Sequence, residues 1–293
     1  MKFFTKKTIA LLCLFLTILL ILLLRLLHPL SVPTMAEGQG TPLPVVMYHH
    51  VLSDGSRLLG AYVVSVSELE SDLCWLKAAG YTPILPSALT AYVESGAPLP
   101  PKPILLSFDD GYESFYANAL PLLQKYQSPA VVSVIGRYTD LYSQPGESGH
   151  LNYSHITWDQ LKSLENEPLV EVGSHSYDRH DATGKHSPRG AKQERGQTDE
   201  AYLAALRSDT QKLQDAIAAH GLKLPTLYAY PFGYYTDQSE AMLGEMGFRI
   251  TLSCEEGCSV ITRDPASLRL LKRYNRAHGR SSADFFAKMG LAA

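Results

Sequence analysis

The chain has 293 residues, of which 45% are hydrophobic and 19% charged, and its formal net charge is −3 at pH 7. This is the composition of an ordinary globular protein, and its length fits one large domain or two small ones. It lacks the basic patches that nucleic-acid-binding proteins use against phosphates. We therefore exclude DNA and RNA as partners.

The first thirty residues differ from the rest of the chain. Lys2, Lys6 and Lys7 precede an apolar run, and residues 8–30 reach the length of roughly 20 residues that spans a bilayer. Because basic residues before such a run stay in the cytoplasm, we expect residues 1–30 to be a signal anchor that holds the protein in the membrane. The alternative is a signal peptide cleaved near residues 33–36, which would give a secreted protein. Both interpretations place the following domain outside the cytoplasm.

Residues 31–43 are rich in Pro, Gly, Ser and Thr and read as a linker, and a folded domain is expected over residues 44–293. Short apolar segments predict strands at 43–48, 82–85, 104–108, 130–135, 170–174, 227–230, 249–253 and 269–274. Helical spacing predicts helices at 67–79, 87–95, 114–126, 158–165, 199–220 and 239–246, the first with a capping box from Ser67 to Glu70. This alternation indicates βαβ units around a parallel sheet. With about seven units, a single closed or nearly closed α/β barrel is favoured over two domains.

Four cysteines add little to this picture. Cys254 and Cys258 could form a disulfide in an oxidising compartment, or their closeness could be incidental. A zinc site there would need further Cys or His ligands nearby, which the sequence does not offer.

Two adjacent carboxylates, Asp109 and Asp110, follow the predicted strand 104–108 and precede Gly111. Like charges this close in a partly buried site repel each other, and a bound cation removes that cost. One carboxylate could then bind the metal while the other stays free as a base. The plain alternative is a turn followed by a helix cap.

A second polar cluster, residues 173–180, follows the predicted strand 170–174 and contains His175 and His180. Two imidazoles in a turning loop can converge on one ion, and with a carboxylate they form a three-ligand set with open positions. Alone, they could equally be two independent surface histidines. The occurrence of both clusters at strand ends favours an Asp-His-His metal site, and the long polar loop 178–199 beside it fits a functional edge.

The motifs Ser-Phe-Asp-Asp-Gly at 107–111 and Ser-His-Ser-Tyr-Asp-Arg-His at 174–180 resemble those of the polysaccharide deacetylase family, also called NodB homology or carbohydrate esterase 4. The resemblance extends over residues 44–275. It implies a distorted (β/α)7 barrel that hydrolyses N-acetyl groups on amino sugars. It also implies that Asp109 is the general base and that Asp110, His175 and His180 bind the metal.

Residues 229–233, Ala-Tyr-Pro-Phe-Gly, resemble the third motif of this family. The resemblance implies that Tyr230 and Pro231 contact the substrate and that the Tyr230 backbone N–H contributes to an oxyanion hole; plain core packing is the alternative. The arginine that the family carries three residues before this Tyr is replaced by Leu227. Arg273 is our candidate for the missing guanidinium that orients Asp109.

The catalytic acid is expected near the start of the domain. The late Leu-x-x-His motif of many family members is absent, whereas Met-Tyr-His-His at 47–50 resembles the circularly permuted branch that deacetylates poly-N-acetylglucosamine. By this resemblance His49 is the acid; a structural role for His49, or His278 as the acid, is the alternative.

Together these features predict a monomeric, metal-dependent N-deacetylase that acts on poly-N-acetylglucosamine or chitooligosaccharides outside the membrane. Zinc suits the ligand set, and Co²⁺, Ni²⁺, Mn²⁺ or Fe²⁺ would also fit. Peptidoglycan N-acetylglucosamine or N-acetylmuramic acid, acetylxylan, or a glycan-binding module without catalysis are the competing hypotheses.

Overall fold

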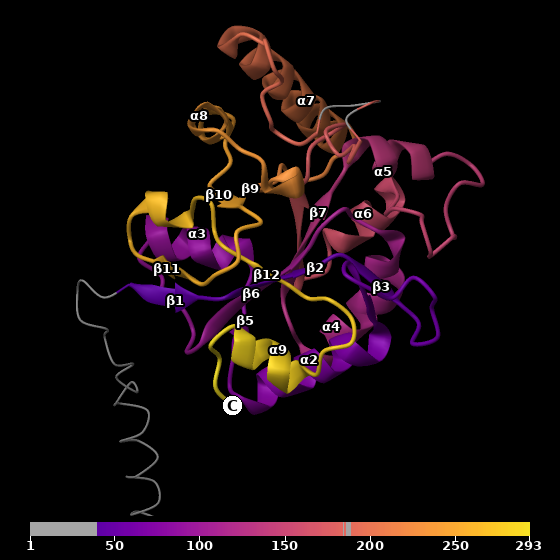
Figure 1. The fold of residues 1–293 in the computed structure, drawn as a ribbon, viewed down its shortest axis with the longest axis vertical. Coiled ribbons are helices and arrows are strands. Elements are labelled where there is room, and N and C mark those ends of the chain that lie inside the picture. The colour runs from indigo at the N-terminus through magenta and orange to yellow at the C-terminus, as the bar shows by residue number, and fades with distance from the viewer. Residues whose placement is uncertain (1–39, 184, 186–188) are drawn as a thin grey trace, which may run out of the picture. The chain divides into compact units, whose positions relative to one another are not determined.

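The computed structural model describes residues 40–183, 185 and 189–293 (Figure 1). The predicted membrane segment and the linker up to residue 39 lie outside this part of the chain. Within the described residues, no helix combines the length and apolar character that a membrane span requires.

Residues 40–293 form one α/β domain around a curled parallel sheet (Figure 1). The strands are β1 (Thr41–Leu43), β2 (Val45–Tyr48), β3 (His50–Leu52), β4 (Val63–Ser65), β5 (Thr82–Pro83), β6 (Pro103–Phe108), β7 (Ala130–Val134), β8 (Val170–Ser174), β9 (Leu227–Ala229), β10 (Ile250–Leu252), β11 (Ser259–Ile261) and β12 (Tyr274–Asn275). The main sheet has the order β10-β9-β8-β7-β6-β2-β12, with β5 beside β6. All its pairs are parallel.

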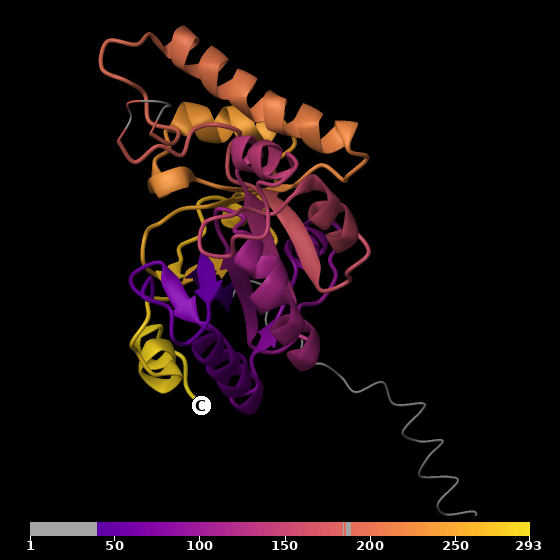
Figure 2. The same ribbon diagram turned by 90° about the vertical axis from the view of Figure 1, so that its right-hand side faces the viewer.

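Most of the helices cover the outer side of this sheet, whereas one helix (Pro86–Glu94) and one short helix (Pro265–Leu268) pack with its inner-face core. The helices are α2 (Val66–Ala78), α3 (Pro86–Glu94), α4 (Leu120–Tyr126), α5 (Gly136–Tyr142), α6 (Trp158–Leu164), α7 (Asp199–Ala219), α8 (Asp237–Glu245) and α9 (Ser282–Lys288), with short helices η1 (Phe115–Ala119), η2 (Pro231–Gly233) and η3 (Pro265–Leu268). The long helix α7 and helix α8 lie side by side at the top of Figure 2. At the other end α2 and α9 pack together, with Trp75 stacked on Phe286 at a ring distance of 4.5 Å.

Helix α2 begins one residue earlier than the spacing predicts, and its capping box is shifted. Ser65, not Ser67, has the extended backbone of an N-cap, and its Oγ accepts from the backbone N–H of Glu68 at 3.2 Å. The Glu68 carboxylate in turn accepts from the Ser65 N–H at 2.9 Å. The prediction of Ser67 and Glu70 was wrong because the helical residues begin at Val66, which makes Ser65 the last extended residue.

Two further predictions at the edges of the domain need correction. Residues 41–43, expected in the linker, form β1, which pairs antiparallel with β11. The expected strand 269–274 is mostly irregular, and only Tyr274 and the next residue form β12. The segment nevertheless contacts both edges of the sheet, because Leu271 forms a bridge to Leu252 of β10 while β12 pairs with β2.

The central strands are buried on both faces, and alternate residues enter different cores. Val46, Leu106 and Val132 pack in the cluster that also contains apolar residues of α2, α4, α6 and α9. Their odd-numbered neighbours Val45, Leu105 and Val131 pack instead in a second cluster with residues of β9 and β10. Because successive side chains of a strand point to opposite faces, this alternation fixes which residues lie on the inner face of the curled sheet.

Candidate metal centre and catalytic site

The residues singled out in the sequence analysis lie at the carboxyl ends of neighbouring parallel strands. His49 follows β2, Asp109 and Asp110 follow β6, and His175 follows β8. His49 and Asp109 continue the odd-numbered series of their strands, so their positions follow those of Val45 and Leu105 on the inner face. The backbone N–H of Asp109 donates to the Tyr48 carbonyl at 2.9 Å, which keeps the two strand ends in register.

The structure brings Asp110, His175 and His180 together. Oδ1 of Asp110 lies 3.4 Å from Nε2 of His175 and 3.3 Å from Nε2 of His180. The three candidate ligand atoms all lie within 4.8 Å of one another. Asp110 has φ +70° and Gly111 φ +67°, so the chain turns through the left-handed region just where the carboxylate leaves the strand.

The chemistry of these three groups fits a divalent cation. Nδ1 of His175 lies 2.8 Å from the Ala229 carbonyl, which can only accept, so in the neutral imidazole Nδ1 carries the proton and Nε2 presents the lone pair. Against the effect of burial, the carboxylates of Asp110 and Asp109 raise the pKa of His175, and a bound cation would take the place of the second proton. Oδ1 of Asp110 is buried and has no hydrogen-bond partner among the described residues. Burial and the neighbouring His175 lower the pKa of His180 to about 4, which keeps that imidazole neutral at pH 7. One carboxylate and two neutral imidazoles are a ligand set for Zn²⁺ and other divalent transition metals, and they do not select one.

The second carboxylate, Asp109, is held by Arg273. Nη1 of Arg273 lies 2.8 Å from Oδ1 of Asp109, and both side chains are buried. The Arg273 guanidinium is itself fixed by the Ser253 carbonyl, to which its Nε donates at 2.7 Å. Burial disfavours the charged carboxylate, but Arg273 and His175 outweigh it and hold the pKa of Asp109 below its usual range. Arg273 thus supplies a guanidinium to Asp109, as the sequence analysis proposed, although it lies near the C-terminal end of the chain.

Tyr230 does not supply the backbone donor that the motif resemblance implied. Its N–H donates to the Leu252 carbonyl at 3.0 Å, and its hydroxyl donates to Glu240 at 2.7 Å. The prediction failed because Tyr230 still continues the β9 pairing with β10, which uses its N–H.

Within the described part of the chain, Phe232, two residues later, has the free backbone N–H beside a metal ligand that was expected of Tyr230. It has φ +59°, its ring stacks on His180 at 4.4 Å, and its N–H has no acceptor among the described backbone groups. A left-handed residue next to a metal ligand is the local signal for this position, and it cannot be seen in the sequence alone.

His49 and His278, the two candidates for the acid, lie in different environments. His49 is partly buried beside Tyr62, with its ring edge-on at 4.9 Å, and its Nδ1 has no hydrogen-bond partner in the described part of the chain. Burial lowers the pKa of His49 below its ordinary value, although the charges of Asp110 and Asp109 act in the opposite direction. His278 instead binds Glu68 at 2.8 Å at the start of α2. The charges of both aspartates thus act on His49, whereas the contact of the His278 side chain is with Glu68.

Two residues outside the predicted site support the ligand loops. Nδ1 of His155 lies 2.8 Å from the Asp110 carbonyl, and its ring stacks on Tyr112 at 4.6 Å. Asp209 of α7 accepts from the backbone N–H groups of Tyr177 and Asp178 at 2.9 and 2.8 Å, between the two histidine ligands. Neither has a sequence signal, since one lies in an irregular loop and the other on an ordinary helix.

The cysteine pair does not form a disulfide. Cys254 and Cys258 are both free thiols. Sγ of Cys254 lies 3.7 Å from Nη2 of Arg273, so this thiol contacts the guanidinium that holds Asp109.

The fold and the site formed by Asp109, Asp110, His175 and His180 are those of a known protein family. The model of the family "Polysaccharide deacetylase" matches residues 96–251, and the chain belongs to this family. Among curated proteins, it is 28% identical over 209 residues to the poly-β-1,6-N-acetyl-D-glucosamine N-deacetylase of Escherichia coli K12, covering 66% of this chain and 31% of that protein. It is 25% identical over 234 residues to the enzyme of the same name from Staphylococcus aureus MRSA252, covering 76% of each. The chain therefore spans about a third of the E. coli relative.

Solved structures agree on the fold. IcaB from Ammonifex degensii superposes with a TM-score of 0.64 at 25% identity, covering 87% of this chain and 99% of that one. The deacetylase domain of BpsB from Bordetella bronchiseptica gives a TM-score of 0.65 at 25% identity, covering 82% and 97%. The Streptococcus pyogenes deacetylase PplD shares the fold with a TM-score of 0.67 at 19% identity, covering 85% and 99%.

Proposed function

We propose that this protein is a metal-dependent hydrolase that removes N-acetyl groups from poly-β-1,6-N-acetylglucosamine. The observation that carries the proposal is the juxtaposition of a complete Asp-His-His ligand set with a separate, arginine-held carboxylate on the neighbouring residue. The names of the curated relatives supply the substrate class.

Each side chain has a defined task in this reaction. A divalent cation bound by Asp110, His175 and His180 would polarise the acetyl carbonyl and acidify the attacking water. Asp109 accepts the proton of that water, and Arg273 keeps the carboxylate ionised and oriented. We assign to the backbone N–H of Phe232, whose ring stacks on His180, the stabilisation of the developing oxyanion.

His49 acts as the general acid in this scheme. It donates a proton to the amide nitrogen of the sugar, so that the amine leaves when the C–N bond breaks. Since Asp109 must be ionised and His49 protonated, activity requires two groups in opposite protonation states, which gives a bell-shaped pH profile.

The finer features expected from the sequence belong to the same proposal. The metal is zinc, and the protein acts as a monomer. The segment 271–275 contacts both β10 and β2, and it closes the sheet into a distorted (β/α)7 barrel. Residues 8–30 anchor the protein in the membrane, with the catalytic domain outside the cytoplasm. Protease treatment of intact spheroplasts tests this topology, because it should digest the domain while a cytoplasmic marker survives.

Acetate release tests the activity and the substrate together. The purified, metal-loaded protein is assayed on β-1,6-linked N-acetylglucosamine oligomers, chitooligosaccharides, peptidoglycan and acetylxylan, beside Asp109→Asn. We expect the fastest release from the β-1,6 oligomers and almost none from the variant. Faster release from peptidoglycan or acetylxylan would assign a different substrate. Equally low release by both proteins, with glycan binding retained, would identify a binding module.

A further inference from the structure

A basic cavity lies beside the candidate metal centre and has no part in the reaction described above. Its volume is about 380 Å³, and its lining consists of Arg189, Lys192, Gln193, Glu194 and Arg195. These residues belong to the segment between the ligand loop and α7.

Arg189 connects this cavity to the metal site. It pairs with the ligand His180 in an antiparallel bridge. Its guanidinium lies 5.6 Å from the centre of the Phe232 ring, and that ring stacks on His180 at 4.4 Å. Lys192 lies 5.4 Å from the centre of the Tyr234 ring, which Arg189 also contacts at 5.5 Å. The single aromatic ring of Phe232 therefore separates the Arg189 guanidinium from the metal ligand His180.

The basic segment is held firmly in this place. The N–H of Gly190 donates to the Arg179 carbonyl at 2.8 Å. A Cβ at Gly190 would lie 2.5 Å from the Pro231 carbonyl oxygen, and its φ is +66°, so only glycine allows this close approach. Ala191 is fully buried, and its carbonyl accepts from the Tyr202 hydroxyl at 2.7 Å. The backbone that carries Arg189 and Lys192 consequently keeps a fixed position beside the metal centre.

The charge of the cavity is not neutralised by its surroundings. Three cations face one carboxylate, Glu194, and within the described residues no ion pair or hydrogen bond engages the side chains of Arg189, Lys192 or Arg195. The chain as a whole has a net charge of −3, so this positive patch is a local feature.

We propose that the cavity is a sugar subsite that selects by charge: it admits N-acetylglucosamine, which is neutral, and rejects glucosamine, whose amine is protonated at neutral pH. The inference rests on the proposed function, because that reaction turns each neutral sugar into a cationic one. A chain already deacetylated at the neighbouring position is repelled by Arg189 and Lys192. The enzyme therefore leaves acetylated sugars between the amines instead of clearing consecutive ones.

Defined oligosaccharides test this subsite. The substrates are the fully acetylated β-1,6-linked pentamer and two isomers that carry one glucosamine on either side of the central sugar. For the wild type at low salt, we expect about five-fold slower release from the central sugar of one isomer than from the parent. This corresponds to an amine that lies about 8 Å in water from each of two unit positive charges. High salt should reduce this ratio.

Arg189→Gln/Lys192→Gln should bring the ratio below about two-fold. The matched control Arg207→Gln removes an exposed cation on α7, paired with Glu245, and should leave the ratio unchanged. Because the readout is a ratio between substrates for one protein, a general loss of activity in the double variant does not imitate the result.

The outcomes separate this inference from the proposed function. Equal rates on all three oligomers, or a ratio that survives in the double variant, would overturn the charge-selective subsite while acetate release still supports the deacetylase. No acetate from any of the three would overturn the proposed function and the subsite with it.

Discussion

Arg273 and Asp109 form a buried ion pair across 164 positions of the chain, with Nη1 of the arginine 2.8 Å from Oδ1 of the carboxylate. The side chains are 0% and 2% exposed. An isolated carboxylate at such a site would favour its neutral form, which cannot accept a proton. The guanidinium is the largest single contribution that keeps Asp109 ionised and able to accept a proton.

Replacement of Arg273 should move the acidic limb of the pH profile. Activity is present above the pKa of the base and is lost as the pH falls through it. That pKa lies below its usual range because Arg273, together with His175 and His49, outweighs burial. In Arg273→Met burial dominates, so the pKa rises and the acidic limb of kcat/KM should move up by about one to three pH units.

Arg273→Lys keeps the charge and should restore part of this shift. The neighbouring Lys272→Met removes an exposed cation, paired with Glu255, and should leave the limb in place. An unchanged limb in Arg273→Met, with the protein still folded, would show that Arg273 does not control the base.

Removal of one metal ligand should abolish metal binding without unfolding the domain. His180→Ala loses one of three ligands, and we expect a metal content below about a tenth of the wild-type value with kcat lower by at least about 10²-fold. Metal analysis after dialysis and acetate release after chelation and readdition of Zn²⁺ measure both effects. His150→Ala, in an exposed loop, is the matched control. Full metal content in His180→Ala would exclude His180 as a ligand.

The acid can be assigned by comparing two histidines. His49→Gln should lower kcat by about 10²–10⁴-fold, as expected for loss of a general acid, with metal content preserved. His278→Gln breaks only the contact with Glu68 at the surface and should change kcat by less than about two-fold. The reverse order of effects would make His278 the acid.

The alternation of strands and helices and the ligand clusters could be predicted because they depend on local patterns. A buried parallel strand is an apolar run, and strand-end residues such as Asp110 and His175 meet at one edge of a parallel sheet. Their convergence with His180 needed only a turning loop of the right length.

Features that depend on where the hydrogen bonding between two strands ends could not be predicted from the sequence. The N–H of Tyr230 is not free because the hydrogen bonding of β9 extends by one residue. The positive φ of Phe232 accompanies the stacking of its ring on His180, a contact between separate loops. The contact of Arg273 with Asp109 joins segments 164 positions apart, which no local pattern predicts. Arg273 was proposed only because the arginine of the family motif is missing.

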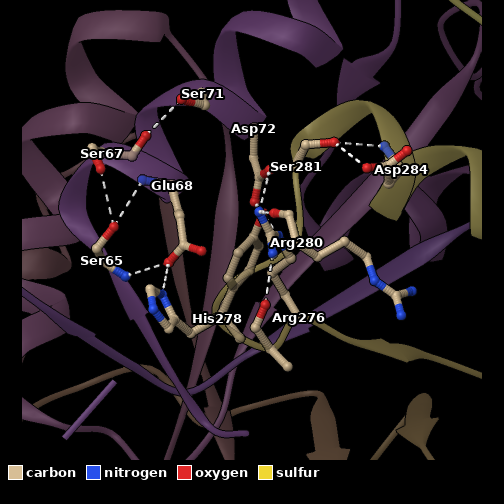
Figure 3. A network of polar contacts seen from close by, with 12 residues as sticks. Ser65, Ser67, Glu68, Ser71, Asp72, Arg276, His278, Arg280, Ser281 and Asp284 are labelled. Atoms are coloured by element: carbon tan, nitrogen blue, oxygen red, sulfur yellow. Dashed lines mark hydrogen bonds and ion pairs between the residues drawn. The ribbon is translucent and has the colours of Figure 1, made fainter. Parts of the chain in front are cut away.

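Arg276 is a second buried arginine of the C-terminal segment, and it should contribute to the stability of the domain. Arg276 binds Asp72 of α2 through Nε at 2.8 Å and Nη2 at 3.2 Å, and it also donates to the Arg280 carbonyl at 2.9 Å (Figure 3). The side chains of Arg276 and Asp72 are 1% and 0% exposed. Tyr48, next to His49, donates its hydroxyl to the same carboxylate at 2.9 Å. This network fastens the C-terminal segment to α2 and to the strand end that carries the acid.

Arg276→Met should lower the free energy of unfolding by about 3–5 kcal/mol, because it leaves the Asp72 carboxylate buried without its partner. Urea denaturation measures this loss. Burial already raises the pKa of Asp72 with Arg276 present, so without Arg276 the carboxylate should protonate at a still higher pH. A folded-state pKa above the unfolded value means that stability is lost as the pH rises through it, and the deficit of the variant should therefore shrink as the pH is lowered.

Arg276→Met/Asp72→Asn removes both charges and should regain most of the loss, whereas Arg280→Met, at an exposed site, should cost less than about 0.5 kcal/mol. Equal stability of Arg276→Met and Arg280→Met at pH 7 would show that the buried pair does not hold the C-terminal segment.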